Sequence, residues 1–147
     1  MRLVVQRVEK AKVIRVSDGK IVGQIGLGLL VLVGFKKDDN EKAVELLAAK
    51  LVKLRVIGDE KEKMNLSVSD SGGSLLIVSQ FTLYADTSGG NRPSFVDAEE
   101  PEKAKKLYEF FVAKIKESNI NIQTGSFGDY MKIEAILDGP VTILFSE

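Results

Sequence analysis

SLLIVSQFTL, residues 74–83, joins an uninterrupted apolar run to a polar end. The run follows Gly72-Gly73, and a short apolar run bounded by turn residues is typical of a strand buried on both faces. Phe81 and Leu83 keep an apolar alternation beyond the run, so the pattern predicts that the strand continues to Leu83. We therefore expect this strand to lie at the centre of the fold.

The polar residues near the end of this strand are Ser79, Gln80 and Thr82. They need hydrogen-bond partners, because an unpaired buried polar group costs about 1–3 kcal/mol. One interpretation is that they bond to neighbouring backbone groups. The other is that the strand delivers them to a pocket, where backbone N–H groups near Phe81 and Thr82 bind a ligand oxygen. The residues alone leave both interpretations open.

The rest of the chain has the pattern of short strands with two separate helices. Strands are predicted over residues 2–15, 20–25, 29–35, 55–57, 64–68, 120–123, 130–137 and 141–145. Helices are predicted from the cap residues 38–40 to Leu54 and from Pro101 to Glu117, because apolar residues recur there at helical spacing. This order predicts one α+β domain over residues 1–147, with a barrel-like mixed or antiparallel sheet and two main helices packed on it.

A polar segment at residues 84–95 is long enough to be a functional loop. It contains Arg92-Pro93-Ser94-Phe95, which places a guanidinium beside a residue of fixed φ and an aromatic ring. The segment is either a solvated crossover or a contact for a phosphate or a ribose.

The chain contains no His and no Cys. Their absence excludes a Ser-His-Asp triad, a Cys nucleophile, a His general base and the ordinary zinc sites. Any catalysis must use carboxylates, Lys, Tyr, hydroxyls, backbone amides or a group that the substrate carries. We expect no metal and no cofactor.

Charge and hydropathy restrict the kinds of partner and the cellular compartment that we expect for this protein. The basic residues number 21 and the acidic residues 21, so a polyanionic partner would need a local basic patch. No apolar run reaches the roughly 18 residues of a membrane span. The first residues lack the pattern of a signal peptide, and a chain without Cys forms no disulfides, so we expect a cytoplasmic location.

Gly139-Pro140 interrupts two apolar segments near the end of the chain. Because proline cannot donate to a ladder, the dipeptide marks an edge or a break in a sheet. It forms either an ordinary β-turn or a cis bond that turns carbonyl oxygens outward, where they can accept an ammonium group. The sequence does not choose between these two structures.

Two of these segments resemble the motifs of one known family. Ser79-Gln80-Phe81-Thr82-Leu83 is similar to the signature of the D-aminoacyl-tRNA deacylases, and Gly139-Pro140-Val141-Thr142 is similar to their second motif. The resemblance extends to residues 4–8, 64–67, 84–87, 92–95 and 124–128. It implies a homodimer that hydrolyses the ester between tRNA and a D-amino acid, or glycine mischarged on tRNA(Ala), for proofreading.

The same resemblance implies roles for the residues of both motifs. Gly139 and Pro140, joined by a cis bond, reach from one subunit into the other's pocket and hold the substrate amino group through main-chain oxygens. An L side chain would collide with this element. The catalytic residues implied are Ser79, Gln80, Phe81 and Thr82, and the substrate-binding residues are Gly139, Pro140, Phe127 and Met131.

The resemblance also suggests a mechanism without a reactive side chain. Amides around Phe81 and Thr82 stabilise the oxyanion, and the ribose 2′-hydroxyl of the tRNA assists hydrolysis. Thr82 is the alternative nucleophile, ranked lower because no base is evident to activate it. Arg7 is expected to anchor the Gly-Pro segment, whereas Leu137 departs from the Asn that is usual in the family.

Two other functions remain open on the sequence. One is a catalytically silent RNA-binding or protein-binding dimer on the same fold. The other is a hydrolase of free D-aminoacyl or N-modified small molecules.

Overall fold

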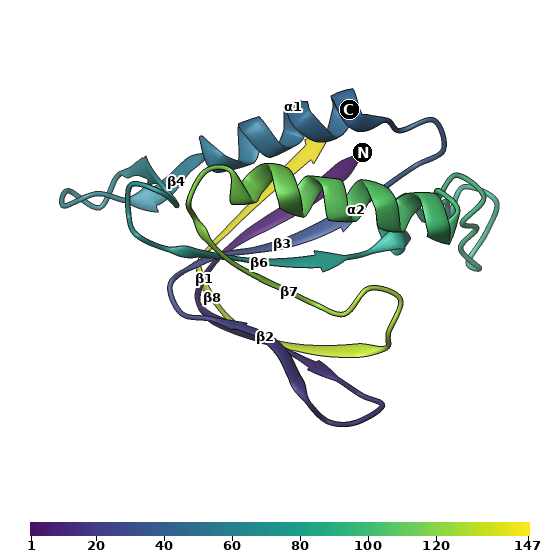
Figure 1. Ribbon diagram of the computed structural model, residues 1–147, viewed down its shortest axis with the longest axis horizontal. Coiled ribbons are helices and arrows are strands. Elements are labelled where there is room, and N and C mark those ends of the chain that lie inside the picture. The colour runs from purple at the N-terminus through teal and green to yellow at the C-terminus, as the bar shows by residue number, and fades with distance from the viewer.

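The computed structural model describes residues 1–147 and contains eight strands, two α-helices and one 3-10 helix (Figure 1). The strands are β1 (Arg2–Arg15), β2 (Ile21–Ile25), β3 (Gly28–Gly34), β4 (Arg55–Gly58), β5 (Met64–Ser67), β6 (Ser74–Ser79), β7 (Asn121–Thr124) and β8 (Met131–Ser146). The helices are α1 (Glu41–Val52), η1 (Phe81–Tyr84) and α2 (Pro101–Lys116).

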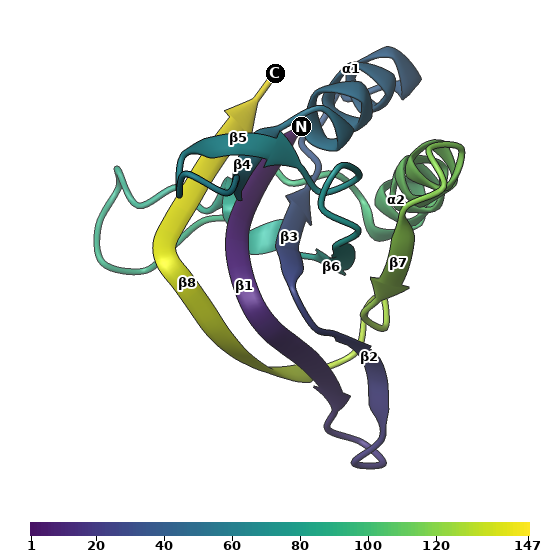
Figure 2. The same cartoon turned by 90° about the vertical axis from the view of Figure 1, so that its left-hand side faces the viewer.

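The main sheet is built around the long strand β1. Its order is β2-β1-β3-β6-β7, and β8 pairs with β1 along the other edge of that strand. Strands β3, β6 and β7 run parallel to one another, whereas β1 is antiparallel to β2, β3 and β8. Figure 2 shows that β1 and β8 bend strongly along their length, so the sheet curls.

The curl brings β2 back toward β7. A Cβ atom added to Gly23 of β2 would lie 2.6 Å from the carbonyl oxygen of Thr124 in β7, so only glycine permits this approach. The sheet is therefore nearly closed into a barrel. This confirms the predicted α+β fold with a barrel-like mixed sheet and two helices.

Strand β6 is buried on both faces, as its apolar run predicts. Leu75 and Ile77 belong to the larger core, where the sheet meets α1 and α2. Leu76 and Val78 belong to a second core on the inside of the curl, with residues of β1, β2 and β3. The two helices lie side by side over one face of the sheet (Figure 1), and their buried residues include Leu47 of α1. Neither helix combines the length and the apolar character needed to cross a lipid bilayer.

The prediction that the strand continues to Leu83 is wrong. Its last ladder pair joins Val33 to Ser79, and the chain then turns into η1. The reason is that the partner strand β3 ends at Gly34 and the side chain of Tyr84 is buried, which pulls the backbone out of the sheet.

The prediction of two separate strands around Gly139-Pro140 is also wrong. Strand β8 runs unbroken from Met131 to Ser146, and the Gly139–Pro140 bond within it is cis. The ladder pairs Gln6 with Thr142 and Val8 with Leu137, so residues 138–141 stand opposite Arg7 alone. Proline has no N–H group to donate to a ladder, and it is tolerated in this bulge because β8 is an edge strand there.

Candidate active site

The C-terminal end of β6 carries the first motif to one edge of the sheet. Because β3 and β6 are parallel, both strands end at this edge, and the antiparallel β1 begins there. Ser79 is the last residue of β6 and is half-buried. The Gln80 N–H donates to the carbonyl oxygen of Val33 at 2.7 Å, which fixes the point where the chain leaves the sheet.

Two backbone N–H groups at the start of η1 are available to a ligand. The first internal bond of η1 runs from the Leu83 N–H to the Gln80 carbonyl oxygen at 3.4 Å, and the N–H groups of Phe81 and Thr82 donate to no protein acceptor. Both residues are exposed. The first N–H groups of a helix lack partners inside it and attract negative charge. This turn can therefore bind an oxyanion.

The side chains of Gln80 and Thr82 contact each other. Nε2 of Gln80 donates to Oγ1 of Thr82. No carboxylate or lysine makes a hydrogen bond to this hydroxyl, and the chain contains no histidine. The hydroxyl therefore lacks the general base that a threonine nucleophile requires.

The predicted binding residues Phe127 and Met131 lie on and after the loop that follows β7. The Gly125 N–H donates to the carbonyl oxygen of Ile77 at 2.9 Å, which ties this loop to β6. A Cβ atom on Gly125 would lie 3.0 Å from Sδ of Met131 and 3.4 Å from Cγ1 of Val78, so Met131 lies close to the end of β6. The ring of Phe127 instead turns toward Tyr108 of α2, at 5.6 Å between centroids.

The second motif lies on the exposed edge strand β8. Both Gly139 and Pro140 are exposed. Arg7 holds this segment, with Nε 2.7 Å from Oδ2 of Asp138 and Nη1 donating to the carbonyl oxygen of Val56 at 2.8 Å. The contact with Asp138 is an ion pair rather than a hydrogen bond, since Nε has no hydrogen-bond partner. Within one chain, no hydrogen bond or ion pair joins Gly139–Pro140 to η1.

Sequence reasoning missed two residues that contact η1 from the neighbouring strands. Nη1 of Arg2 donates to the carbonyl oxygen of Leu83 at 2.7 Å, and the guanidinium carbon lies 4.6 Å from the ring centroid of Tyr84. Gly34 leaves room for the carbonyl of Gln80, since a Cβ atom there would lie 2.8 Å from that oxygen. No local pattern marks either residue, because both contacts join segments far apart in the sequence.

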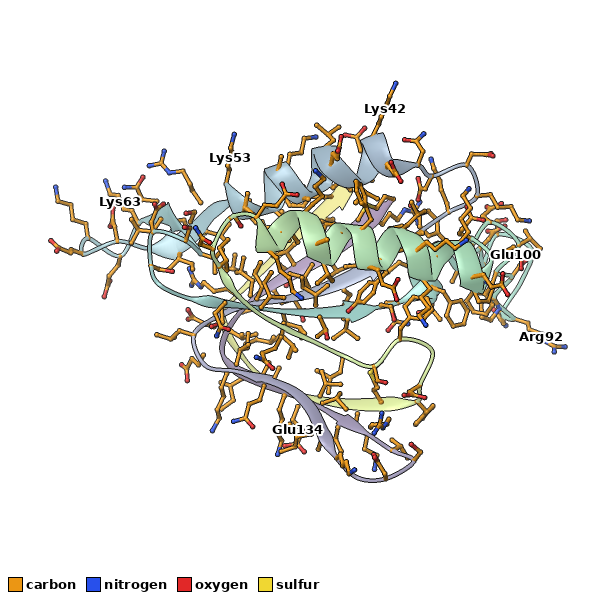
Figure 3. All side chains as sticks on the ribbon, in the orientation of Figure 1. Lys42, Lys53, Lys63, Arg92, Glu100 and Glu134 are labelled. Carbon is orange, nitrogen blue, oxygen red and sulfur yellow. The ribbon has the colours of Figure 1, made fainter.

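The predicted loop packs against the same turn. The ring of Phe95 meets the ring of Phe81 edge-on at 5.1 Å. Paired backbone bonds of 2.8 Å between Asp86 and Ser94 close the loop that lies between them. Figure 3 shows Arg92 on this loop, with its side chain pointing away from the ribbon. No hydrogen bond or ion pair joins Arg92 to η1.

Two hollows of the surface have no lining residue from η1. One of about 450 Å³ lies between β1, β2 and β8 and includes Ile21 and Ile136. The other, of about 400 Å³, includes Lys53 and Asp70, near the end of α1. Neither is lined by residues 79–84.

Comparison with other sequences identifies the family. The family model described as D-Tyr-tRNA(Tyr) deacylase matches residues 4–146. A protein of Thermosipho melanesiensis named D-aminoacyl-tRNA deacylase is 57% identical over 145 residues, covering 98% of this chain and 95% of that protein. A protein of Koribacter versatilis with the same name is 54% identical over 144 residues, covering 98% and 95%.

Solved structures share the fold. The structure named c-Myc DNA Unwinding Element Binding Protein superposes with a TM-score of 0.92 at 37% identity, covering 100% of this chain and 99% of that one. A probable eukaryotic D-amino acid tRNA deacylase superposes with a TM-score of 0.84 at 17% identity, covering 98% and 97%, and shows a shared fold. With its family model matched over nearly its whole length, the chain belongs to the D-Tyr-tRNA(Tyr) deacylase family, whose members are hydrolases of the aminoacyl-tRNA ester.

Proposed function

We propose that this protein releases D-amino acids from tRNA by hydrolysis, with η1 as the reaction centre. The observation that carries the proposal is the pair of exposed N–H groups of Phe81 and Thr82, which have no protein acceptor. They lie within the segment that resembles the family signature, in a chain without His or Cys. The reaction centre is thus made of main chain.

The two amides bind the carbonyl oxygen of the ester as negative charge develops on it. One donor of this kind is typically worth about 2.7–4 kcal/mol in the transition state. Water adds to the carbonyl carbon, the bond to the ribose 3′-oxygen breaks, and that oxygen takes up a proton. The products are the free amino acid and tRNA with an intact 3′-hydroxyl.

The ribose 2′-hydroxyl assists this step in place of a protein base. The proposal is supported by the surroundings of Thr82, whose hydroxyl accepts a hydrogen bond from Gln80 and contacts no base. An aminoacyl ester is an activated acyl group, so binding of the oxyanion and the assisting hydroxyl supply the chemistry. Gln80 and Ser79 are assigned to positioning.

Selection against L-amino acids is assigned to Gly139 and Pro140 of a second subunit. Support comes from β8, which pairs only with β1 and leaves its other edge free. This edge carries exposed apolar side chains, with Leu144 exposed at 73%, Ile136 at 44% and Leu137 at 42%. A long apolar edge strand tends to pair with another chain. We therefore propose a homodimer whose active sites combine η1 of one subunit with Gly139–Pro140 of the other.

Further parts of the proposal concern the range of substrates, the residues of the binding pocket and the cellular location. Glycine has no side chain to collide with the Gly-Pro element, so glycine mischarged on tRNA(Ala) is included as a substrate. Phe127 and Met131 are assigned to the binding pocket, and Met131 has the closer position because it lies beside Val78. The chain is assigned to the cytoplasm, where aminoacylated tRNA is made and used.

The test compares esters of one amino acid in both configurations. The purified protein is incubated with D-tyrosyl-tRNA, L-tyrosyl-tRNA and D-tyrosine methyl ester, and free tyrosine is measured over time. Release of tyrosine from D-tyrosyl-tRNA, but not from the other two esters, supports the proposal. Binding of the RNA without release indicates the silent RNA-binding dimer, and rapid cleavage of the methyl ester indicates a hydrolase of small molecules.

A further inference from the structure

The turn η1 is held in place by two residues that are paired on neighbouring strands of the sheet. Arg2 of β1 and Gly34 of β3 are direct partners in the β1–β3 ladder. Arg2 contacts the end of η1, and Gly34 lies against the carbonyl of Gln80 directly before η1 and against Leu83. Neither belongs to the motifs that identify the family signature.

Arg2 fixes the end of the turn. Its guanidinium donates to the carbonyl oxygen of Leu83 at 2.7 Å and lies 4.6 Å from the ring centroid of Tyr84. A charged donor makes a stronger hydrogen bond than a neutral one, and the planar guanidinium can use a carbonyl and a ring together. The turn is therefore tied to the first residues of β1 through one side chain.

Gly34 allows η1 to lie close to strand β3. A Cβ atom at this position would lie 2.8 Å from the carbonyl oxygen of Gln80 and 3.0 Å from Cβ of Leu83. The Gln80 carbonyl accepts the first internal hydrogen bond of η1, from Leu83. Any side chain larger than glycine must push this bond, and the amides next to it, away from β3.

Tyr84 anchors the turn between these two contacts. Its side chain is buried, at 6% exposure, whereas Phe81 at the other end of η1 is 57% exposed. The turn thus has one fixed side, which faces the protein, and one open side, which presents the N–H groups of Phe81 and Thr82. Arg2 and Gly34 determine where the open side lies.

We propose that Arg2 and Gly34 are positioning residues, which hold the Phe81 and Thr82 amides where the ester carbonyl binds. The assignment rests on the proposed function, in which these amides stabilise the oxyanion. Neither residue touches the substrate. Displacing a catalytic group by about 1 Å can cost on the order of a hundredfold in rate, so a small shift of the turn matters.

The test uses Arg2→Met and Gly34→Ala in the full chain with D-tyrosyl-tRNA as substrate. We expect kcat to fall by roughly ten- to a hundredfold in either variant, with KM unchanged. Arg2→Lys should recover part of the rate, because an ammonium group can also donate to the Leu83 carbonyl. Lys12→Met is the control, since Lys12 lies on the same strand and pairs with Glu134 of β8, which is not part of the proposed site.

A double variant separates positioning from general damage. Phe81→Pro removes one of the two N–H groups, so Arg2→Met should lower the rate much less in that background than in the wild type. Equal losses in both backgrounds, or full activity of Arg2→Met, would overturn the assignment.

Backbone amide NMR signals give a readout that does not depend on activity. Arg2→Met should shift the signals of Phe81 and Thr82, whereas Lys12→Met should leave them in place. If the wild type does not cleave D-tyrosyl-tRNA but Arg2→Met still shifts the NMR signals of Phe81 and Thr82, the proposed function fails, whereas the role of Arg2 in positioning these amides stands. Unmoved signals overturn the positioning role whatever the activity.

Discussion

Arg7 Nε lies 2.7 Å from Asp138 Oδ2, at the bulge where residues 138–141 of β8 stand opposite Arg7 alone. The guanidinium also donates to the carbonyl oxygen of Val56 in β4. Its side chain is only 17% exposed, against 42% for Asp138. One half-buried cation therefore joins three segments of the chain directly beside Gly139–Pro140.

Replacing Arg7 by Met should loosen this segment and weaken the preference for D-esters. The bond to Val56 is charge-assisted, so its loss is expected to cost about 1.5–3 kcal/mol of unfolding free energy. The ratio of cleavage rates for D- and L-tyrosyl-tRNA measures the preference. Lys12→Met is the control, because Lys12 pairs with Glu134 across the same two strands. An unchanged ratio in folded Arg7→Met would mean that Arg7 does not support chiral selection.

Phe81→Pro should slow hydrolysis far more than Phe81→Ala. Both variants remove the ring that packs against Phe95, but only proline also removes the N–H group. The difference between the two variants is expected to be on the order of a hundred- to a thousandfold in kcat. Single-turnover rates with D-tyrosyl-tRNA measure it. Equal rates in the two variants would show that this amide has no part in the reaction.

Thr82→Ala should retain substantial activity, because no base contacts its hydroxyl. A tRNA that ends in 2′-deoxyadenosine should be a very poor substrate for the wild type, since the assisting hydroxyl is gone. Both results are read from the same single-turnover assay, with Thr82→Ser as the control for shape. Activity of Thr82→Ala at background, with normal folding and full cleavage of the deoxy substrate, would instead identify Thr82 as the nucleophile.

The sequence predicts the buried part of this fold well. The apolar run of β6 indicates burial on both faces, and Leu75 and Leu76 do belong to the two different cores. Local patterns also place both helices close to their observed bounds. These features depend on the residues within each element, so a pattern in the chain is enough to predict them.

The geometry of the candidate site could not be predicted in the same way. The strand ends at Ser79 because of Gly34 and Tyr84, and η1 is held by Arg2, which lies far away in the sequence. The bulge around Gly139–Pro140 depends on its register with Arg7. Contacts between distant segments leave no periodic pattern, so the sequence points to the site residues only through the family resemblance, and the contact of Arg7 with the Gly-Pro segment is the one such contact that it predicts.

Tyr108→Phe should lower stability at neutral pH by about 0.5–1.5 kcal/mol. The Tyr108 hydroxyl is buried and donates to the carbonyl oxygen of Ile77 at 2.8 Å. Burial raises the pKa of Tyr108 above its ordinary value of about 10. The stabilisation is therefore complete below about pH 10 and is lost as the pH rises toward the higher pKa of the folded state, because the unfolded chain ionises first.

Urea unfolding at several pH values checks this dependence. The wild type should lose stability above about pH 10 more steeply than Tyr108→Phe. Tyr84 contributes to the decline in both proteins, since burial raises its pKa to about 12. Parallel curves for the two proteins would contradict the assignment to Tyr108.

The proposed active site, shared between two subunits, makes a prediction about mixtures of two variants that each damage a different half of the site. Gly139 has a φ of +117°, and a Cβ atom there would lie 2.9 Å from Cγ2 of Val141 and 3.3 Å from Nη2 of Arg7, so Gly139→Ala should displace the Gly-Pro element. Phe81→Pro damages η1 and leaves that element intact. In a hybrid dimer, one site therefore combines the undamaged η1 of one subunit with the undamaged Gly-Pro element of the other.

Mixing equal amounts of the two variants and allowing the subunits to exchange should restore chiral hydrolysis to about a quarter of the wild-type rate, because half of the dimers are hybrids and each hybrid holds one intact site. The D- and L-tyrosyl-tRNA rates are measured before and after exchange, and sedimentation confirms the dimer. Mixing each variant with itself is the control. If the hybrids form but the rate does not rise, each chain uses its own Gly139–Pro140, and the site does not cross the interface.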